Sequence, residues 1–121
     1  MIHGHVVGLQ ARVSVAVDSP TQNTVQLEFV IDTGFEGALT MPTDMIAELG
    51  LPFIEEMTAK PANGETVRTD VHISRIIWDE TEVEASVPAM GSRPLLGTSL
   101  LAGKDLVAQF VDAGLITIDA I

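Results

Sequence analysis

Short apolar runs separated by turn-forming residues occupy most of this chain, and this pattern limits its fold more than any other feature. Apolar and polar residues roughly alternate from Val6 to Val17, and a second run extends from Val25 to Ile31 after the turn residues Asp18-Ser19-Pro20. Alternation with a period of two is typical of strands that bury one face, and a turn between two such runs predicts a β-hairpin. We therefore expect the chain to begin with paired strands.

Further extended runs indicate that the rest of the chain is also mostly β. These predicted strands span Phe53 to Ala59, Val67 to Trp78, Val83 to Val87, Leu106 to Phe110 and Leu115 to Ile118. Turn residues separate them at Asn63-Gly64, at Asp79-Glu80 and at Ala113-Gly114. The Asn-Gly pair is a strong hairpin signal because both residues tolerate a positive φ.

Two segments predict short helices. Thr43 to Gly50 has a capping residue, helix-forming residues and a terminating glycine, and Pro52 follows it. Thr98 to Leu106 has room for one or two helical turns, with Thr98 or Ser99 as the N-cap. Because we find no repeat and no interdomain linker, residues 1–121 are predicted to form a single domain. The chain is short for an open sandwich with so many strands, which favours a closed, barrel-like arrangement.

Charge and composition exclude several classes of function. The chain has 6 Lys and Arg residues against 17 Asp and Glu residues, and its net charge of −11 disfavours binding to nucleic acid or to an anionic membrane. It contains no cysteine, which excludes disulfides, thiol nucleophiles and thiolate metal sites. Hydrophobic residues make up 46% of the chain, so a partner is expected to cover part of its apolar surface. The N-terminus lacks a secretory signal and no segment has the roughly 20 apolar residues of a membrane helix, which favours a cytoplasmic location.

The sequence Asp32-Thr33-Gly34 is the strongest candidate for a functional site. It follows an apolar run that ends at Ile31, so a carboxylate stands on a tight loop at the end of a predicted strand. On its own this could be an ordinary turn, because Asp and Gly are common turn residues. A second element, Leu95-Leu96-Gly97, joins an apolar pair that could form a buried strand to a glycine that permits close approach of another backbone. The two elements are more specific together than either is alone.

The order of these elements resembles that of the retropepsin-like aspartic proteases. In that family apolar residues precede Asp-Thr-Gly, a hairpin follows, and an apolar pair with a glycine comes later; here these are Asp32-Thr33-Gly34, the turn at Asn63-Gly64 and Leu95-Leu96-Gly97. The resemblance covers nearly the whole chain and is greatest to the small bacterial and archaeal members, in which an aromatic residue such as Phe35 follows Asp-Thr-Gly. It implies a mostly β, closed retropepsin-like barrel with one or two short helices.

The resemblance also implies an activity and a homodimer. Two aspartates held close together share a proton, so one can activate a water molecule while the other protonates the peptide carbonyl. Because the chain has one Asp-Thr-Gly, the dyad would consist of Asp32 from each of two subunits. The expected activity is endoproteolytic hydrolysis of a peptide or protein substrate, without a metal or an organic cofactor.

Each matched residue takes an expected role from the family. Asp32 would be the catalytic carboxylate, Thr33 would bond the loop backbone of the partner, and Gly34 would let the loop pass close to the dyad. The structural support of this active loop would come from Leu95, Leu96 and Gly97. The substrate-binding residues would be Phe35 and the flap residues Ala62, Asn63 and Gly64.

Three differences from the retroviral pattern leave alternatives open. Phe35 replaces a small residue beside the dyad, Thr98 replaces an arginine that supports retroviral dimers, and only one glycine, Gly64, marks the proposed flap. A catalytically weak or inactive peptide-binding or dimerisation module of the same fold is therefore a second hypothesis, motivated by Phe35 filling the site. A third hypothesis, a small barrel that binds an apolar ligand, depends only on the high apolar fraction.

Two further observations concern charged or metal-binding side chains. His3, His5 and His72 could in principle bind a metal, because His3 and His5 would share a strand face. A metal site is not expected, because the terminus is prone to fraying and no acidic or histidine fourth ligand is evident. Glu36, on the same predicted loop as Asp32, could stand near the dyad or be a solvated loop residue, and we favour the second interpretation.

Overall fold

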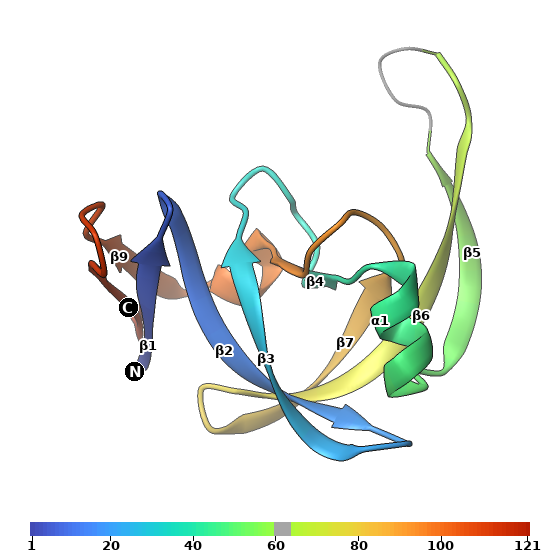
Figure 1. Ribbon diagram of the computed structural model, residues 1–121, viewed down its shortest axis with the longest axis horizontal. Helices are drawn as coiled ribbons and strands as arrows, with labels where there is room; N and C mark the ends of the chain where they lie inside the picture. The colour runs from blue at the N-terminus through green and yellow to red at the C-terminus, as the bar shows by residue number, and fades with distance from the viewer. Residues whose placement is uncertain (60–63) are drawn as a thin grey trace.

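The computed structural model describes residues 1–59 and 64–121, and most of them lie in β-strands of one connected sheet (Figure 1). The elements in chain order are β1 (Ile2–Val7), β2 (Gln10–Ser19), β3 (Asn23–Ile31), β4 (Leu39–Thr40), α1 (Thr43–Leu49), β5 (Phe53–Ala59), β6 (Val67–Trp78), β7 (Thr81–Pro88), β8 (Leu95–Leu96), the 3₁₀ helix η1 (Thr98–Leu101), β9 (Lys104–Ala108) and β10 (Leu115–Ala120). The prediction of a mostly β fold with one or two short helices is confirmed.

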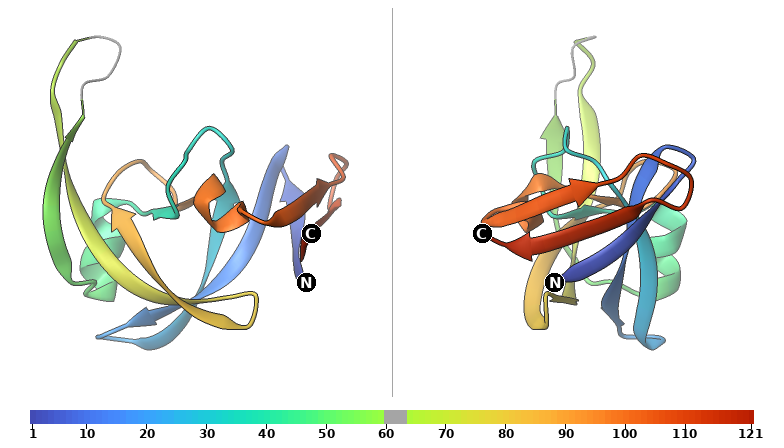
Figure 2. Two further views of the ribbon diagram at one scale, coloured as in Figure 1. Left: turned by 180° about the vertical axis from the view of Figure 1, so that it is seen from behind. Right: turned by 90° about the vertical axis from the view of Figure 1, so that its left-hand side faces the viewer.

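The sheet branches at β2. Its main path runs in the order β4-β8-β3-β2-β1-β10-β9, and β2 also pairs with β6, which in turn pairs with β5 and β7. This is possible because β2 is long: Ala11 and Arg12 pair with β1, whereas Ala16 and Val17 pair with β6. Figure 2 shows the two branches on opposite sides of the molecule, with β9 and β10 on one side and the β5–β6 hairpin on the other.

The prediction that the sheet closes into a barrel is wrong. Among the described residues, β4 and β9 end the main path of the sheet and do not pair with each other. An isolated parallel bridge between Met41 and Ala89 links the end of β4 to the end of β7. Strands β4 and β8 have only two residues each. The contact between the ends of β4 and β7 is therefore a single bridge and not a continuous ladder.

The period-two pattern places the core as expected, but it does not reveal every turn. In β2 the buried residues alternate with less buried ones, as in Val13, Val15 and Val17. However, the run predicted from Val6 to Val17 is two strands, because the chain reverses at Gly8-Leu9, where φ is 55° and 63°. A leucine with a positive φ is unusual, so this turn carries little signal in the sequence.

The two helices differ in how well they were predicted. Helix α1 ends as expected, at Gly50 in the left-handed conformation, but its N-cap is Pro42 and it has no side-chain cap. The predicted helix from Thr98 to Leu106 is shorter than expected, because η1 ends at Leu101 and β9 begins at Lys104. Its N-cap is Gly97, without a side-chain cap, rather than Thr98 or Ser99.

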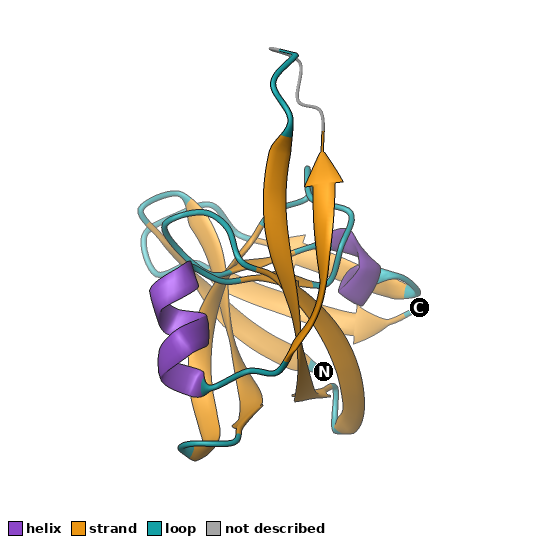
Figure 3. Cartoon of the chain, turned by 90° about the vertical axis from the view of Figure 1, so that its right-hand side faces the viewer, coloured by secondary structure: helices purple, strands orange, loops and turns teal. Residues whose placement is uncertain are grey.

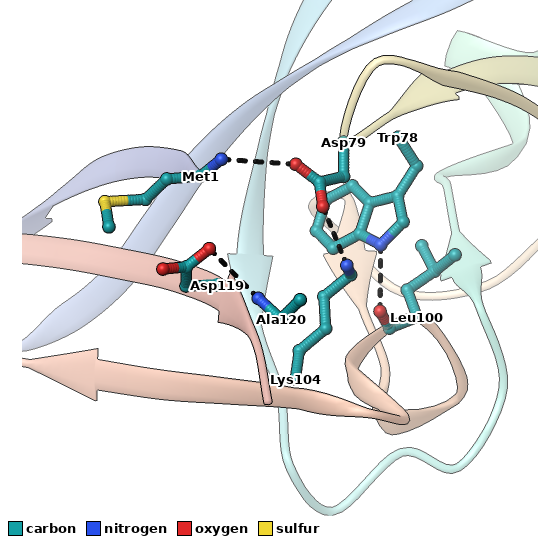
Figure 4. Close-up of polar contacts among 7 residues, drawn as sticks. All are labelled: Met1, Trp78, Asp79, Leu100, Lys104, Asp119 and Ala120. Atoms are coloured by element: carbon teal, nitrogen blue, oxygen red, sulfur yellow. Dashed lines mark hydrogen bonds and ion pairs between the residues drawn. The ribbon is translucent and has the colours of Figure 1, made fainter.

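Side-chain contacts hold η1 and β9 against the β6–β7 turn (Figure 4). The indole Nε1 of the buried Trp78 donates a hydrogen bond to the carbonyl oxygen of Leu100 at 2.9 Å. In the turn that follows, Asp79 accepts a hydrogen bond from Lys104 Nζ at 2.9 Å and pairs with the terminal amine of Met1 at 3.3 Å. The Lys104 hydrogen bond, with a smaller contribution from the amine, lowers the pKa of Asp79 below its ordinary value of 3.8.

None of the described helices has the length and hydropathy needed to cross a bilayer.

Candidate active site

Asp32 stands on a loop that begins where β3 ends, and backbone hydrogen bonds fix its position. Its N–H donates to the carbonyl oxygen of Leu96 at 2.9 Å, and its own carbonyl oxygen accepts from the N–H of Phe35 at 3.2 Å. The carboxylate Oδ1 accepts a hydrogen bond from the N–H of Gly34 at 2.9 Å. Asp32 is half-buried and its neighbour Thr33 is exposed. The carboxylate is therefore oriented by the backbone and still accessible from solvent.

The structure places Leu95-Leu96-Gly97 directly beside this loop. Strand β8 pairs parallel to β3, with Leu96 next to Ile31, and antiparallel to β4. Leu96 is fully buried and anchors the element in the core. The two motifs that the sequence singled out are thus brought together by strand pairing, 65 residues apart in the chain.

Gly97 allows the closest approach between the two segments. A Cβ atom at this position would lie 2.2 Å from the carbonyl oxygen of Gly37 and 2.6 Å from that of Phe35, and contacts this short do not occur. Its N–H donates to the carbonyl oxygen of Ala38 at 2.8 Å. The loop after Asp32 can therefore lie against β8 and η1 only because residue 97 has no side chain.

The ring of Phe35 lies against the glycines of this loop. A Cβ atom on Gly37 would be 2.5 Å from Phe35 Cζ, and one on Gly97 would be 2.5 Å from Phe35 Cδ2. Phe35 is half-buried, whereas the following Glu36 is exposed. The ring therefore packs on the backbone that supports Asp32, and part of it remains exposed to solvent.

Thr98 is a supporting residue whose role the sequence did not indicate. Its N–H and its hydroxyl both donate to the carbonyl oxygen of Phe35, at 2.8 Å and 3.3 Å. In the retroviral pattern an arginine stands here; in this chain a short hydroxyl side chain contacts the loop that follows Asp32 instead. The only available signal was the position of Thr98 directly after Gly97.

The residues predicted to form the flap fall between β5 and β6 in the chain. The β5–β6 hairpin extends away from the body of the protein at the end where the loop after β3 lies (Figures 1 and 3). Gly64 is exposed, with a φ of 83°, and a Cβ atom there would meet no neighbour. The predicted flap residues Ala62 and Asn63 lie outside the described residues.

One chain contributes one carboxylate to this site. In the part of the chain that the structure describes, the polar contact of the Asp32 side chain is with the Gly34 N–H, and no group of three or more His, Asp or Glu residues is placed to hold a metal ion. A hollow of about 490 Å³ lies elsewhere, near Asn23 and Thr24 at the start of β3, whereas Asp32 follows the end of that strand. Asp32 therefore lies away from this hollow.

Comparisons with known proteins support the fold. The sequence matches no family model and no curated protein. The structure is similar to the crystal structure of a retropepsin-like aspartic protease from Rickettsia conorii, with a TM-score of 0.59 and 18% sequence identity over 100% of this chain and 92% of that one. At this identity the similarity establishes the fold and not the activity. The chain therefore has a retropepsin-like fold.

Proposed function

We propose that this chain is an aspartic endopeptidase that becomes complete as a homodimer. The observation that carries the proposal is the backbone-fixed, accessible carboxylate of Asp32, held beside Leu95-Leu96-Gly97 in a retropepsin-like fold. A single chain has half of the required dyad, because it has one such carboxylate. A twofold axis between two copies would bring the two Asp32 side chains together.

The chemistry follows from the coupling of two carboxyl groups. Two carboxylates within hydrogen-bonding distance share one proton, so that one is ionised and the other is protonated. The ionised Asp32 accepts a proton from water as its oxygen attacks the peptide carbonyl carbon, and Asp32 of the partner subunit donates its proton to the carbonyl oxygen. Proton transfer to the amide nitrogen then allows the C–N bond to break, which gives a carboxyl and an amine product.

The remaining site residues position these groups. Thr33 would bond the loop backbone of the partner, and Gly34 would keep the loop close to the dyad. Phe35 and the flap residues Ala62, Asn63 and Gly64 would contact the substrate, and the β5–β6 hairpin would cover it and exclude water. An extended substrate would pair with the flap backbone as an added strand.

A second candidate is a peptide-binding or dimerisation module of the same fold with weak or no catalysis. It is favoured by the position of Phe35, whose ring lies against Gly37 and Gly97 and would narrow the space beside a dyad formed by two Asp32 side chains. Such a module would bind peptides and form dimers without releasing products.

Replacing Asp32 with Asn tests the proposal. The parent protein should cleave a denatured-protein digest, with a bell-shaped, acid-favoured pH profile, as expected for a shared proton. Asp32→Asn should lose cleavage and keep the circular dichroism spectrum and dimer mass of the parent, while the matched control Asp112→Asn, at an exposed turn position, should keep all three.

Cleavage that persists in purified Asp32→Asn protein would refute the proposal. Peptide binding by the parent without product would favour the second candidate. A parent protein that stays monomeric under assay conditions would also refute the dyad, since one chain has half of it.

A further inference from the structure

A second hollow, of about 350 Å³, lies between α1 and β6, at the base of the proposed flap. Its wall is formed by Ile46 and Ala47 of α1, by Arg68, Asp70 and His72 of β6, and by Ala89. We call it the α1–β6 hollow. It is apolar on the α1 side and charged on the β6 side, and its size is within the range of small-ligand sites.

The charges on the β6 side are not balanced. Glu56 on β5 and Asp70 on β6 stand directly opposite each other, so their carboxylates share one face of the hairpin. Like charges in this arrangement are destabilising. Arg68 Nε lies 3.8 Å from Glu56 Oε1, but the carboxylate of Asp70 has no hydrogen-bond or ion-pair partner among the described residues. One negative charge at the hollow therefore lacks a cation.

His72 adds a polar atom without a partner. Its Nδ1 is buried and makes no hydrogen bond among the described residues, and its ring packs edge-on against Phe53 with the centroids 5.8 Å apart. A neutral imidazole can accept a hydrogen bond through Nδ1 when its proton is on Nε2. Asp70 is exposed, so it is the group that a guest with an N–H donor would meet directly.

The hollow is connected to the Asp32 loop by a chain of backbone contacts. The Asp32 N–H donates to the carbonyl oxygen of Leu96, and the strand of Leu96, β8, pairs with β4. Met41, at the end of β4, forms a β-bridge with Ala89. The Ala89 N–H then donates to the carbonyl oxygen of Asp70 at 2.8 Å. The first three of these contacts lead from Asp32 to Ala89, which lines the hollow, and with neighbouring strands about 4.8 Å apart they span on the order of 15 Å. An extended peptide covers that distance with about four or five residues.

We infer that the α1–β6 hollow binds a Lys or Arg side chain of the peptide substrate, about four or five residues from the scissile bond. The inference rests on the proposed function. An acidic guest would meet Glu56 and Asp70, and an apolar guest would leave Asp70 without a partner. The aliphatic stem of a basic residue packs on Ile46 and Ala47 while its head group bonds on the β6 side. The net charge of −11 also attracts cationic peptides.

Position-resolved cleavage tests this assignment. The parent protein, Asp70→Asn and Asp105→Asn digest the same randomised decapeptide mixture, and the products are sequenced by mass spectrometry. The parent should enrich Lys and Arg at one position four or five residues from the cut, by roughly fivefold in kcat/KM over norleucine. Asp70→Asn should lose most of this preference, whereas Asp105→Asn, which removes an exposed carboxylate from β9, should keep it. A preference that both variants lose equally would overturn the assignment, because it would reflect net charge and not the hollow.

A binding measurement separates failure of this inference from failure of the proposed function. Isotope-labelled Asp32→Asn protein is titrated with N-acetyl-lysine amide and with N-acetyl-norleucine amide, and backbone amide signals are followed by NMR. The lysine compound should shift the signals of residues 68–72 and of Ala89, with an affinity at least about fivefold higher than that of the norleucine compound. Equal shifts for the two compounds, or shifts elsewhere only, would overturn the inference. Selective shifts together with no cleavage by the parent would support the hollow and refute the protease.

Discussion

Replacing Gly97 with Ala should disturb the active loop through one methyl group. The backbone of Gly97 has a φ of −101° and a ψ of 178°, which alanine adopts without strain. The cost therefore comes from contact alone. The new Cβ atom would lie 2.2 Å from the carbonyl oxygen of Gly37, and ordinary contacts begin at 3.4 Å, so the two segments must separate by about 1.2 Å.

The magnitude follows from the contacts that such a separation weakens. Overpacking by one methyl group costs about 1–3 kcal/mol. The hydrogen bonds from the N–H groups of Gly97, Thr98 and Ser99 to the loop, at 2.8, 2.8 and 3.3 Å, would also lengthen, and each is worth about 1 kcal/mol. We expect Gly97→Ala to lower the free energy of unfolding by about 3 kcal/mol, which corresponds to a fall in Tm of about 10 °C for a chain of this length.

Under the proposed function, the loop shift should also reduce peptide cleavage. Moving a catalytic group by about 1 Å can cost about 100-fold in rate, so kcat of the remaining folded Gly97→Ala protein should fall by about that factor. The assays are thermal unfolding followed by circular dichroism, and cleavage measured well below the Tm of the variant.

Gly37→Ala is the matched control, because it places the same methyl group on the same loop. Its three nearest contacts, at 2.5, 2.8 and 3.4 Å, are all with the ring of Phe35, which can rotate away, whereas the nearest contact at Gly97 is with a backbone oxygen. Gly37→Ala should therefore cost less, and adding Phe35→Leu should restore its Tm but not that of Gly97→Ala. A Tm for Gly97→Ala within about 2 °C of the parent, or no lower than that of Gly37→Ala, would refute this reasoning.

Two further predictions concern stability. The Lys104 hydrogen bond lowers the pKa of Asp79, so the pair stabilises the fold above the ordinary carboxyl pKa of 3.8, and this stabilisation is lost as pH falls through the lowered pKa. The Tm of Asp79→Asn should therefore fall less steeply than that of the parent below about pH 4. Parallel curves of Tm against pH for the two proteins would contradict this prediction. Ser19 is buried and its hydroxyl donates a hydrogen bond to the carbonyl oxygen of Leu49 at 2.7 Å. Ser19→Ala should therefore lower the free energy of unfolding, measured by urea titration, by about 2 kcal/mol. Ser14 is exposed, so the control Ser14→Ala should change this free energy by no more than about 0.5 kcal/mol.

The sequence predicted those parts of the fold whose cause is local. The strands were visible because their buried residues recur every second position, and the turn at Asp79-Glu80 because Asp is a common turn residue that tolerates a positive φ such as the 50° found there. The Gly8-Leu9 reversal was missed because it depends on pairing between β1 and β2 and forces a leucine into a rare conformation. Closure was also misjudged, because the length of β4 and β8 is set by tertiary contacts and not by local preference.

The candidate site was predictable to the extent that it is made of backbone. The sequence indicated the Asp32 loop and Leu95-Leu96-Gly97, but not Thr98, whose hydroxyl reaches the loop only after the two segments are packed. Nor could the pattern of one chain place Asp32 relative to a second copy. Those relations depend on three-dimensional contacts that leave no periodicity and no characteristic spacing in the sequence.

The way the active loop is held explains how this fold persists at low sequence identity. Four backbone hydrogen bonds join the loop to the segment from Leu96 to Ser99. The strictest requirement that this arrangement places on the sequence is that residue 97 has no side chain. Nearly any residues that keep strands of the right period can surround such an arrangement. A chain can therefore share 18% identity with a retropepsin-like protease, match no family model, and still present a carboxylate at the end of β3. It follows that a substitution at Gly97, and not at the residues around it, should displace Asp32 while the rest of the fold is kept.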